Sequence, residues 1–309
     1  MIKIKLVSSP DTNRKIILVQ PRDRASPNPF LRPAGAQRPT AAVDATPRKT
    51  KTLAPVRPAL AVEVEYRKKL LRLIDAMQRS TAHWVAAAYR ADPPHIAQDE
   101  LPAAALSRRV RRLSADWRRR FDDLAADLAK FFARSIAQRS DVALRRSLER
   151  GGMAVRFTMT PAMRDVYRAV INENVSLIRS IPARYFQEIE GIVARSVATG
   201  RDLKQLSDDL QHQFGVVKRR AHLIARDQNN KAGASLQRAR QLELGITQAV
   251  WIHSTAGKEP RPSHLKAGRD KIVFDLATGW YDPDEGKHIL PGQLINCRCV
   301  SRPIVPGFS

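Results

Sequence analysis

The only two cysteines of this 309-residue chain stand two positions apart, in the motif Asn296-Cys297-Arg298-Cys299. In an extended strand, residues i and i+2 face the same side, so both thiols would point together and Arg298 away from them. With His264, and with His288 as a further candidate, the thiolates could bind a tetrahedral Zn²⁺ ion. The alternatives are two packed thiols or a strained disulfide. A single intervening residue is shorter than the usual zinc spacing, which favours packed thiols over the metal.

The segment that carries these residues differs in composition from the chain before it. Residues 251–309 hold six glycines and six prolines, against seven and two in the preceding hundred residues. Its apolar runs are short and bounded by turn residues, which is typical of strands, and they lie at 249–252, 272–274, 289–290 and 299–301. We therefore expect a small β-rich C-terminal domain over residues 246–309, with Trp251 in its core.

Upstream, residues 59–150 are predicted to form a long helical hairpin. Val110, Trp117, Leu124 and Phe131 recur every seven residues, and a neighbouring stripe is filled by Leu106, Leu113, Phe121 and Leu128. One face of a long helix should therefore be buried. Residues 62–89 supply an amphipathic partner. Pro93-Pro94 would break the chain between the two helices.

A helix bundle is predicted for residues 151–245. Thr160-Pro161 places a capping hydroxyl before a proline at the first helical position. Periodic apolar residues follow, and Gly200, Gly215 and Gly245 are expected to end successive helices.

The first 58 residues are predicted to form a basic, Pro-rich arm. Residues 1–60 contain twelve basic and three acidic residues and nine of the twenty prolines. Such a segment buries too little apolar surface to offset its ordering entropy. Only residues 2–20, where two apolar runs flank Ser8-Ser9-Pro10-Asp11-Thr12-Asn13, predict a marginal hairpin. The expected fold class is therefore α+β, with a mainly helical body, a small β-rich C-terminal domain and a largely disordered arm.

The charge of the chain predicts a polyanionic partner. Its formal net charge is +24, and a positive charge of this size attracts polyanions such as nucleic acid. The 43% of hydrophobic residues are enough to form a core. Arginines gather on the outward side of the second long helix, where they could lie along phosphates. The alternative is a solvated face balanced by nearby aspartates. These candidate binding residues are Arg108, Arg109, Arg111, Arg112, Arg118, Arg119 and Arg120.

The order of motifs in the C-terminal half resembles a known family. A helix with Arg226-Asp227 and Asn229-Asn230 comes first. Trp251, His264 and Gly268 follow, and then the cysteine motif and Pro303-Ile304. This order of motifs looks like the C-terminal domain of Mu F-like minor head proteins, the head morphogenesis family of tailed bacteriophages and prophages. It covers roughly residues 181–305. The residues that carry the resemblance are Arg226, Asp227, Trp251, His264, Gly268, Asn296, Cys297, Arg298 and Cys299.

The resemblance implies a minor capsid protein that acts in prohead assembly with portal and major capsid proteins and that contacts double-stranded DNA. It implies a location in the prohead or virion head, and in the host bacterial cytoplasm during assembly. No catalytic residues and no cofactor are expected, apart from the zinc alternative, and no stretch approaches the ~20 apolar residues of a membrane span.

Two other functional classes stay open. One is an enzyme, a metal-dependent hydrolase or a toxin-like transferase that uses His264, Arg226 and the cysteine pair. The other is a non-specific DNA-binding protein. The enzyme is the weaker hypothesis, because the sequence contains no Walker loop, dinucleotide-binding turn or nucleophile elbow.

Overall fold

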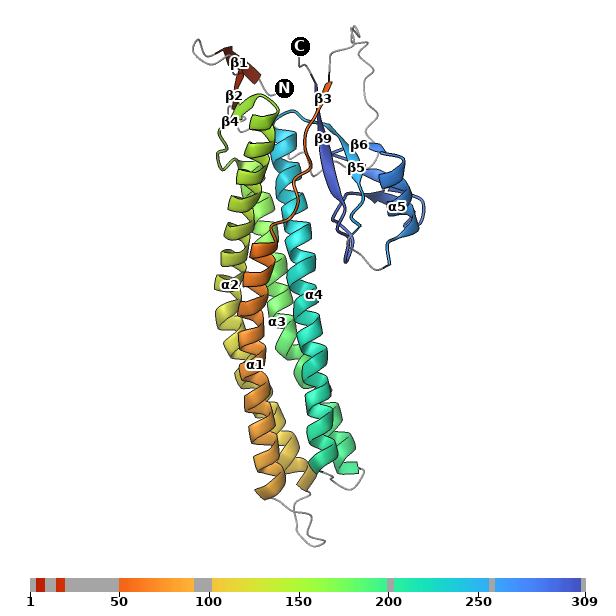
Figure 1. Ribbon diagram of the computed structural model, residues 1–309. Helices are drawn as coiled ribbons and strands as arrows, with labels where there is room; N and C mark the ends of the chain where they lie inside the picture. Colours follow the sequence, from red (N-terminus) through yellow and green to blue (C-terminus); the bar gives the residue numbers. More distant parts are fainter. Residues whose placement is uncertain are drawn as a thin grey trace. The chain divides into compact units, whose positions relative to one another are not determined.

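The computed structural model describes residues 4–8, 15–19, 50–91, 102–198, 203–255 and 259–306 (Figure 1). The chain divides into two compact units. The bundle unit comprises Leu60–Ala133 and Val170–Gln228, and the sheet unit comprises Met1–Ala59, Arg134–Ala169 and Asn229–Ser309. Long helices alongside small antiparallel sheets confirm the α+β class.

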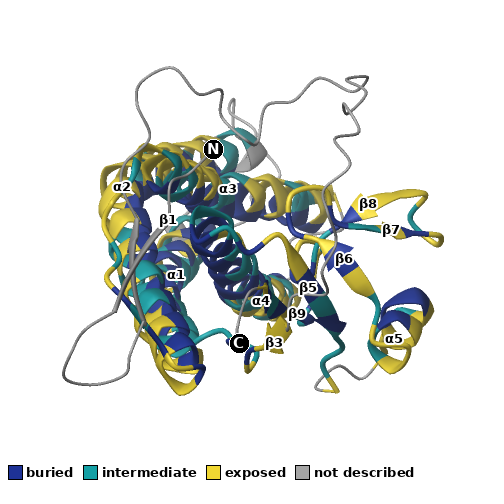
Figure 2. Ribbon diagram, turned by 90° about the horizontal axis from the view of Figure 1, so that it is seen from above, coloured by how far each residue is buried: buried dark blue, intermediate teal, exposed yellow. Residues whose placement is uncertain are grey.

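The bundle unit is built from α1 (Leu60–Ala91) and from parts of α2 (Pro102–Arg150), α3 (Pro161–Ala198) and α4 (Leu203–Glu243). In Figure 2 the buried positions of these helices face one another. Tyr66 of α1 stacks on Phe132 of α2, with ring centroids 4.5 Å apart. The predicted pair of long helices is thus present, and the expected break at Pro93-Pro94 lies outside the described residues.

A buried polar network joins three helices of the bundle unit. The Tyr66 hydroxyl donates to Asn174 Oδ1 at 3.0 Å, and Asn174 Nδ2 donates to Gln228 Oε1, also at 3.0 Å. Gln228 Nε2 in turn donates to Glu173 Oε1 at 2.8 Å. Because buried amides need partners, this network fixes how α1, α3 and α4 meet.

The seven-residue pattern of α2 predicts its buried face only in part. Val110 and Trp117 are buried, but Leu124 is 42% exposed and Phe131 is half-buried. A straight helix drifts by about 20° per heptad, so a strict seven-residue series rotates out of the core. Leu106, Leu113 and Phe121 of the predicted neighbouring stripe are buried, and Ala125, Ala129 and Phe132 take the other buried positions.

The helices of the second half are longer than the glycines predict. α4 runs through Gly215 without a break, and α3 runs through Pro182. A glycine inside a helix costs roughly 0.5–1 kcal/mol, which the buried stripe Leu206, Leu210, Val217 and Ala221 outweighs. Gly245 does follow the end of α4, with φ 74°.

The sheet unit contains a four-stranded antiparallel sheet in the order β3-β9-β5-β6. Its strands are β3 (Thr50–Thr52), β5 (Gln248–Ile252), β6 (Val273–Asp275) and β9 (Val300–Pro306). A helix, α5 (Pro262–Arg269), lies between β5 and β6 in sequence, and a hairpin of β7 (Trp280–Asp282) and β8 (Lys287–Ile289) follows. The strands expected in the C-terminal region are present, and Trp251 is fully buried among them.

Residues 50–56 differ from the prediction of a basic arm over residues 1–58. β3 pairs with β9, and the backbone N–H of Leu53 donates to Pro303 O at 2.9 Å. Leu53 and Val56 are buried in the same core as Trp251. The Pro-rich composition around this short strand concealed it.

The predicted N-terminal hairpin is present as β1 (Ile4–Ser8) and β2 (Lys15–Val19), which pair antiparallel. β2 also pairs in parallel with β4 (Met153–Val155). The turn between β1 and β2 and residues 20–49 of the predicted arm lie outside the described residues.

Candidate functional site

His264 is positioned by the short helix α5. Pro262 at the start of α5 has the fixed φ that suits a first helical turn. The backbone N–H of Ser263 donates to Asp284 Oδ2 at 3.1 Å, which places a carboxylate at this helix end. His264 is 2% exposed, so its ring points into the module.

The cysteines are held by a tight loop that precedes β9. Gly292 and Asn296 adopt the left-handed φ angles of 81° and 62°, which turn the chain twice. The Cys297 N–H donates to Leu294 O at 3.0 Å, and Asn230 Nδ2 of α4 donates to Cys297 O at 3.3 Å. β9 begins at Val300, so both cysteines lie in this loop and not in the extended strand considered for them.

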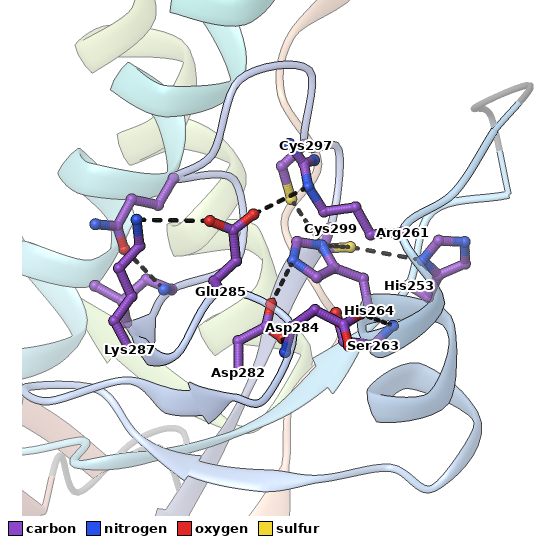
Figure 3. Close-up of polar contacts among 12 residues, drawn as sticks. His253, Arg261, Ser263, His264, Asp282, Asp284, Glu285, Lys287, Cys297 and Cys299 are labelled. Carbon is purple, nitrogen blue, oxygen red and sulfur yellow. Dashed lines mark hydrogen bonds and ion pairs between the residues drawn. The ribbon is translucent and has the colours of Figure 1, made fainter.

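The loop nevertheless brings both sulfur atoms to His264 (Figure 3). His264 Nδ1 lies 3.5 Å from Cys297 Sγ and 3.7 Å from Cys299 Sγ. These three atoms lie within 4.8 Å of one another, and all three residues are buried. A second histidine, His253, approaches Cys299 with its Nδ1 at 3.6 Å. Both cysteines are free thiols.

The contact between the two thiols separates their pKa values. It lowers the pKa of Cys297 to about 4, an effect that burial opposes and that His264 and the Gly292 N–H support. The same contact, together with burial, raises the pKa of Cys299. Burial also lowers the pKa of His253 and favours its neutral imidazole. A thiolate and a neutral imidazole are the forms that bind metal ions.

A buried carboxylate lies on the far side of His264. Asp282, at the end of β7, is fully buried, and its Oδ2 lies 3.3 Å from His264 Nε2. The two atoms are at ion-pair distance without the alignment of a hydrogen bond. Asp282 Oδ1 accepts the backbone N–H of Asp284 at 3.0 Å, which fixes the carboxylate. The His264 ring also packs against Trp251 in a T-shaped contact, with centroids 5.1 Å apart.

Gly268 lets α5 approach the backbone that follows β5. A Cβ atom at this position would lie 2.3 Å from His253 Cβ and 2.9 Å from His253 N. Only glycine fits at such a distance. The close approach keeps His253 and His264 on neighbouring segments beside the cysteine loop.

The remaining predicted site residues are not among the side chains that converge on His264. Arg226 and Asp227 belong to the part of α4 in the bundle unit, where Asp227 is buried. His288 lies in β8, exposed, and its ring packs against Tyr281. Arg298, between the two cysteines, is half-buried.

Two residues of the cluster were missed by sequence reasoning. His253 directly follows the apolar run 249–252, and a histidine at the end of a strand beside a core tryptophan was the available signal. Asp282 lies in an acidic turn sequence with Asp284 and Glu285, and nothing in the sequence distinguishes it from its neighbours.

The predicted arginine residues lie on α2 in the bundle unit. Arg109 is half-buried and stacks over Trp84, with its guanidinium carbon 4.1 Å from the ring centroid. The other six are exposed, and we call them the arginine face: Arg108, Arg111, Arg112, Arg118, Arg119 and Arg120. Within the described residues, no helix has the length and apolar content needed to cross a bilayer.

Fold and cluster together define a small α+β module, closed around a buried histidine and two cysteines, that follows a long helix. Residues 187–302 match the family described as Phage Mu protein F like protein. This stretch runs from within α3 to within β9, and the match confirms the resemblance seen in the motifs.

One curated relative is an uncharacterized protein of Haemophilus influenzae strain Rd. It is 30% identical over 146 residues, which cover 47% of this chain and 31% of the relative. The match thus spans about a third of the relative's length. No solved structure matches the chain.

Proposed function

We propose that the protein is a minor head protein of a tailed bacteriophage or prophage and acts in head morphogenesis during prohead assembly. The observation that carries this proposal is the match of residues 187–302 to the Phage Mu protein F like family. Portal and major capsid proteins are the partners that the family resemblance suggests, which would place the protein in the prohead or virion head.

Exposed apolar side chains of the C-terminal module offer a contact surface for such a partner. Leu265, Val273, Tyr281 and Ile295 are between 38% and 60% exposed. Large exposed apolar side chains are enriched where proteins meet. The module itself is compact, so it can present them on a fixed backbone.

Co-expression with the portal and capsid proteins of the same phage tests the proposal. The protein should be retained in a pull-down and should sediment with assembled proheads. Substituting Val273→Ser together with Ile295→Ser should weaken retention, whereas the exposed pair Val142→Ser and Val216→Ser, both outside the module, should not. No retention by either partner would contradict the proposal.

We also propose that the arginine face contacts DNA. Two of the aspartates that could balance these charges are engaged by other side chains. Asp122 pairs with Arg179 at 3.0 Å, and Asp127 with Lys130 at 3.9 Å. Asp116 contacts Arg119. The exposed arginines therefore leave an excess of positive charge suited to phosphates.

A gel-shift series across salt concentrations tests the DNA contact. Each phosphate contact contributes about 0.9 to the slope of log affinity against log salt. Changing Arg118, Arg119 and Arg120 to Gln should therefore lower the slope by up to about 3. A matched control on the same helix changes the exposed Arg139, Arg145 and Arg146 to Gln. Equal effects of both triple variants would rule out a specific role for the arginine face.

A further inference from the structure

We propose that His253, His264, Cys297 and Cys299 bind one structural Zn²⁺ ion. In a tetrahedral site with Zn–S near 2.3 Å and Zn–N near 2.0–2.1 Å, neighbouring sulfur and nitrogen ligand atoms are about 3.6 Å apart. The three sulfur–nitrogen distances of the cluster are 3.5, 3.6 and 3.7 Å. The Nδ1 atom of His264 lies close to both sulfurs, so one ion could be bound by all three atoms.

The ligands come from three separate segments of the module. His253 follows β5, His264 lies in α5, and the cysteines precede β9. His264, Cys297 and Cys299 already form a compact triangle. His253 contacts only Cys299 at close range, so a rotation of its half-buried side chain toward the ion completes the tetrahedron. Four protein ligands close the site and make it structural rather than catalytic.

The surroundings of the cluster are those of a metal-bound histidine and thiolate. Histidine ligands usually present the ring nitrogen that is not on the metal to a carboxylate, and Asp282 Oδ2 lies 3.3 Å from His264 Nε2. Burying a carboxylate without a partner costs much free energy, so the fully buried Asp282 requires a compensating partner such as His264. The Gly292 N–H also points at Cys297 Sγ, at 3.4 Å, and can stabilise a metal-bound thiolate.

The ion would fasten a module whose regular elements are short. α5 has eight residues, and β6, β7 and β8 have three each. Modules built from such short elements commonly gain stability from a metal or a cross-link. Zinc would tie α5 to the point where the end of β5 and the cysteine loop meet, next to the β5–β9 pairing of Ile252 with Val300. This inference is independent of the proposed role in the phage head.

Zinc content of the full-length protein is the first test. Protein reconstituted with Zn²⁺ in reducing buffer and then gel-filtered should retain about one equivalent. Less than a tenth of an equivalent would overturn the proposal, as would full retention by the double variant Cys297→Ser with Cys299→Ser. His288→Ala is the matched control, since this exposed histidine of the same module lies outside the cluster, and it should retain the full equivalent.

Cobalt substitution tests the ligand set in the folded wild-type chain. Co²⁺ should give the absorption of a tetrahedral S₂N₂ site, and each single Cys→Ser change should remove about half of the thiolate-to-cobalt band. His253→Ala should keep that band but weaken binding, and unchanged affinity would remove His253 from the site. Asp282→Asn retains all four ligands and should lower metal affinity about ten- to hundredfold. Unchanged metal affinity in Asp282→Asn would show that Asp282 does not support His264 as a ligand.

Discussion

Gly268 brings α5 against the backbone that carries His253, so the smallest substitution there should be felt. In Gly268→Ala the new Cβ would stand 2.3 Å from His253 Cβ and 2.9 Å from a backbone nitrogen that cannot rotate away. We expect a loss of about 1–3 kcal/mol in the free energy of unfolding, measured by urea denaturation. The matched control is Gly233→Ala, whose Cβ would have its nearest contact at 3.7 Å from Ile136 and should be neutral or stabilising. Equal stability of the two variants would contradict the packing argument.

Single residues of the cluster differ in how far the sequence predicts them. Cys297, Cys299 and His264 stand out because of residue type and rarity, and the structure brings them together. The backbone geometry was not predictable, because the loop that carries the sulfurs turns at Gly292 and Asn296, which adopt left-handed φ angles. Asp282 acquires its meaning only from burial beside His264.

Among the elements of the sheet unit, the last turns of α4 are tied to α2 by one buried guanidinium. Arg240 is 4% exposed and contacts Asp141 through two hydrogen bonds of 3.0 Å each. It also donates to Thr158 O at 2.6 Å and to Glu243 Oε2 at 3.1 Å. Such a bidentate pair fixes both the spacing and the rotation of the two helices.

Removing the guanidinium should therefore destabilise the sheet unit strongly. Arg240→Ala leaves Asp141, Glu243 and a carbonyl without their cation, and we expect a loss of about 3–5 kcal/mol in the free energy of unfolding. The double variant Arg240→Leu with Asp141→Leu should recover part of this loss, because apolar pairs replace buried ion pairs well. Chemical denaturation followed by circular dichroism gives both values. A single variant as stable as wild type would show that the pair is not needed.

The polar network between α1, α3 and α4 of the bundle unit predicts a pH dependence. Burial raises the pKa of Tyr66 above its ordinary value of 10.0, and the pKa of Tyr185 to about 12. Both hydroxyls ionise more readily in the unfolded chain, so stability should be full below about pH 10 and should decline as the pH rises above it. Tyr66→Phe should make this decline shallower, with Tyr185 responsible for the remainder.

Tyr66→Phe should also be less stable than wild type at neutral pH. It removes the donor to Asn174 Oδ1 and should cost about 1–3 kcal/mol. Thermal unfolding between pH 7 and pH 11 measures both effects. An alkaline decline identical in wild type and variant would contradict the role of Tyr66.

Elements were predictable where local periodicity and burial agree, as in α1 and the first half of α2. Prediction failed where packing overrides a local signal. α4 passes through Gly215 because its buried stripe is continuous on both sides of the glycine. β3 escaped notice because three residues in a Pro-rich stretch show no periodicity, and only pairing with β9 makes them a strand.

The sheet unit is assembled from chain segments that lie far apart in sequence. Its core combines Leu53 and Val56 with Leu144 and Leu148 of α2 and with Trp251 of β5. The segment that matches the Phage Mu protein F like family begins at residue 187, so part of its core comes from outside the match. A chain trimmed to the family boundaries would lack β3 and the two buried side chains that follow it.

This assembly predicts that a change in the segment 50–56 damages the C-terminal module some 200 residues away. Leu53 is 2% exposed and packs into the core around Trp251, so Leu53→Ala should create a cavity and cost about 2–5 kcal/mol. The control is Leu60→Ala, the same change at the first residue of α1, where the side chain is 67% exposed and the cost should be small. Limited proteolysis should reveal faster cleavage within residues 246–306 in Leu53→Ala alone. Equal cleavage in the two variants would mean that the module holds together without β3.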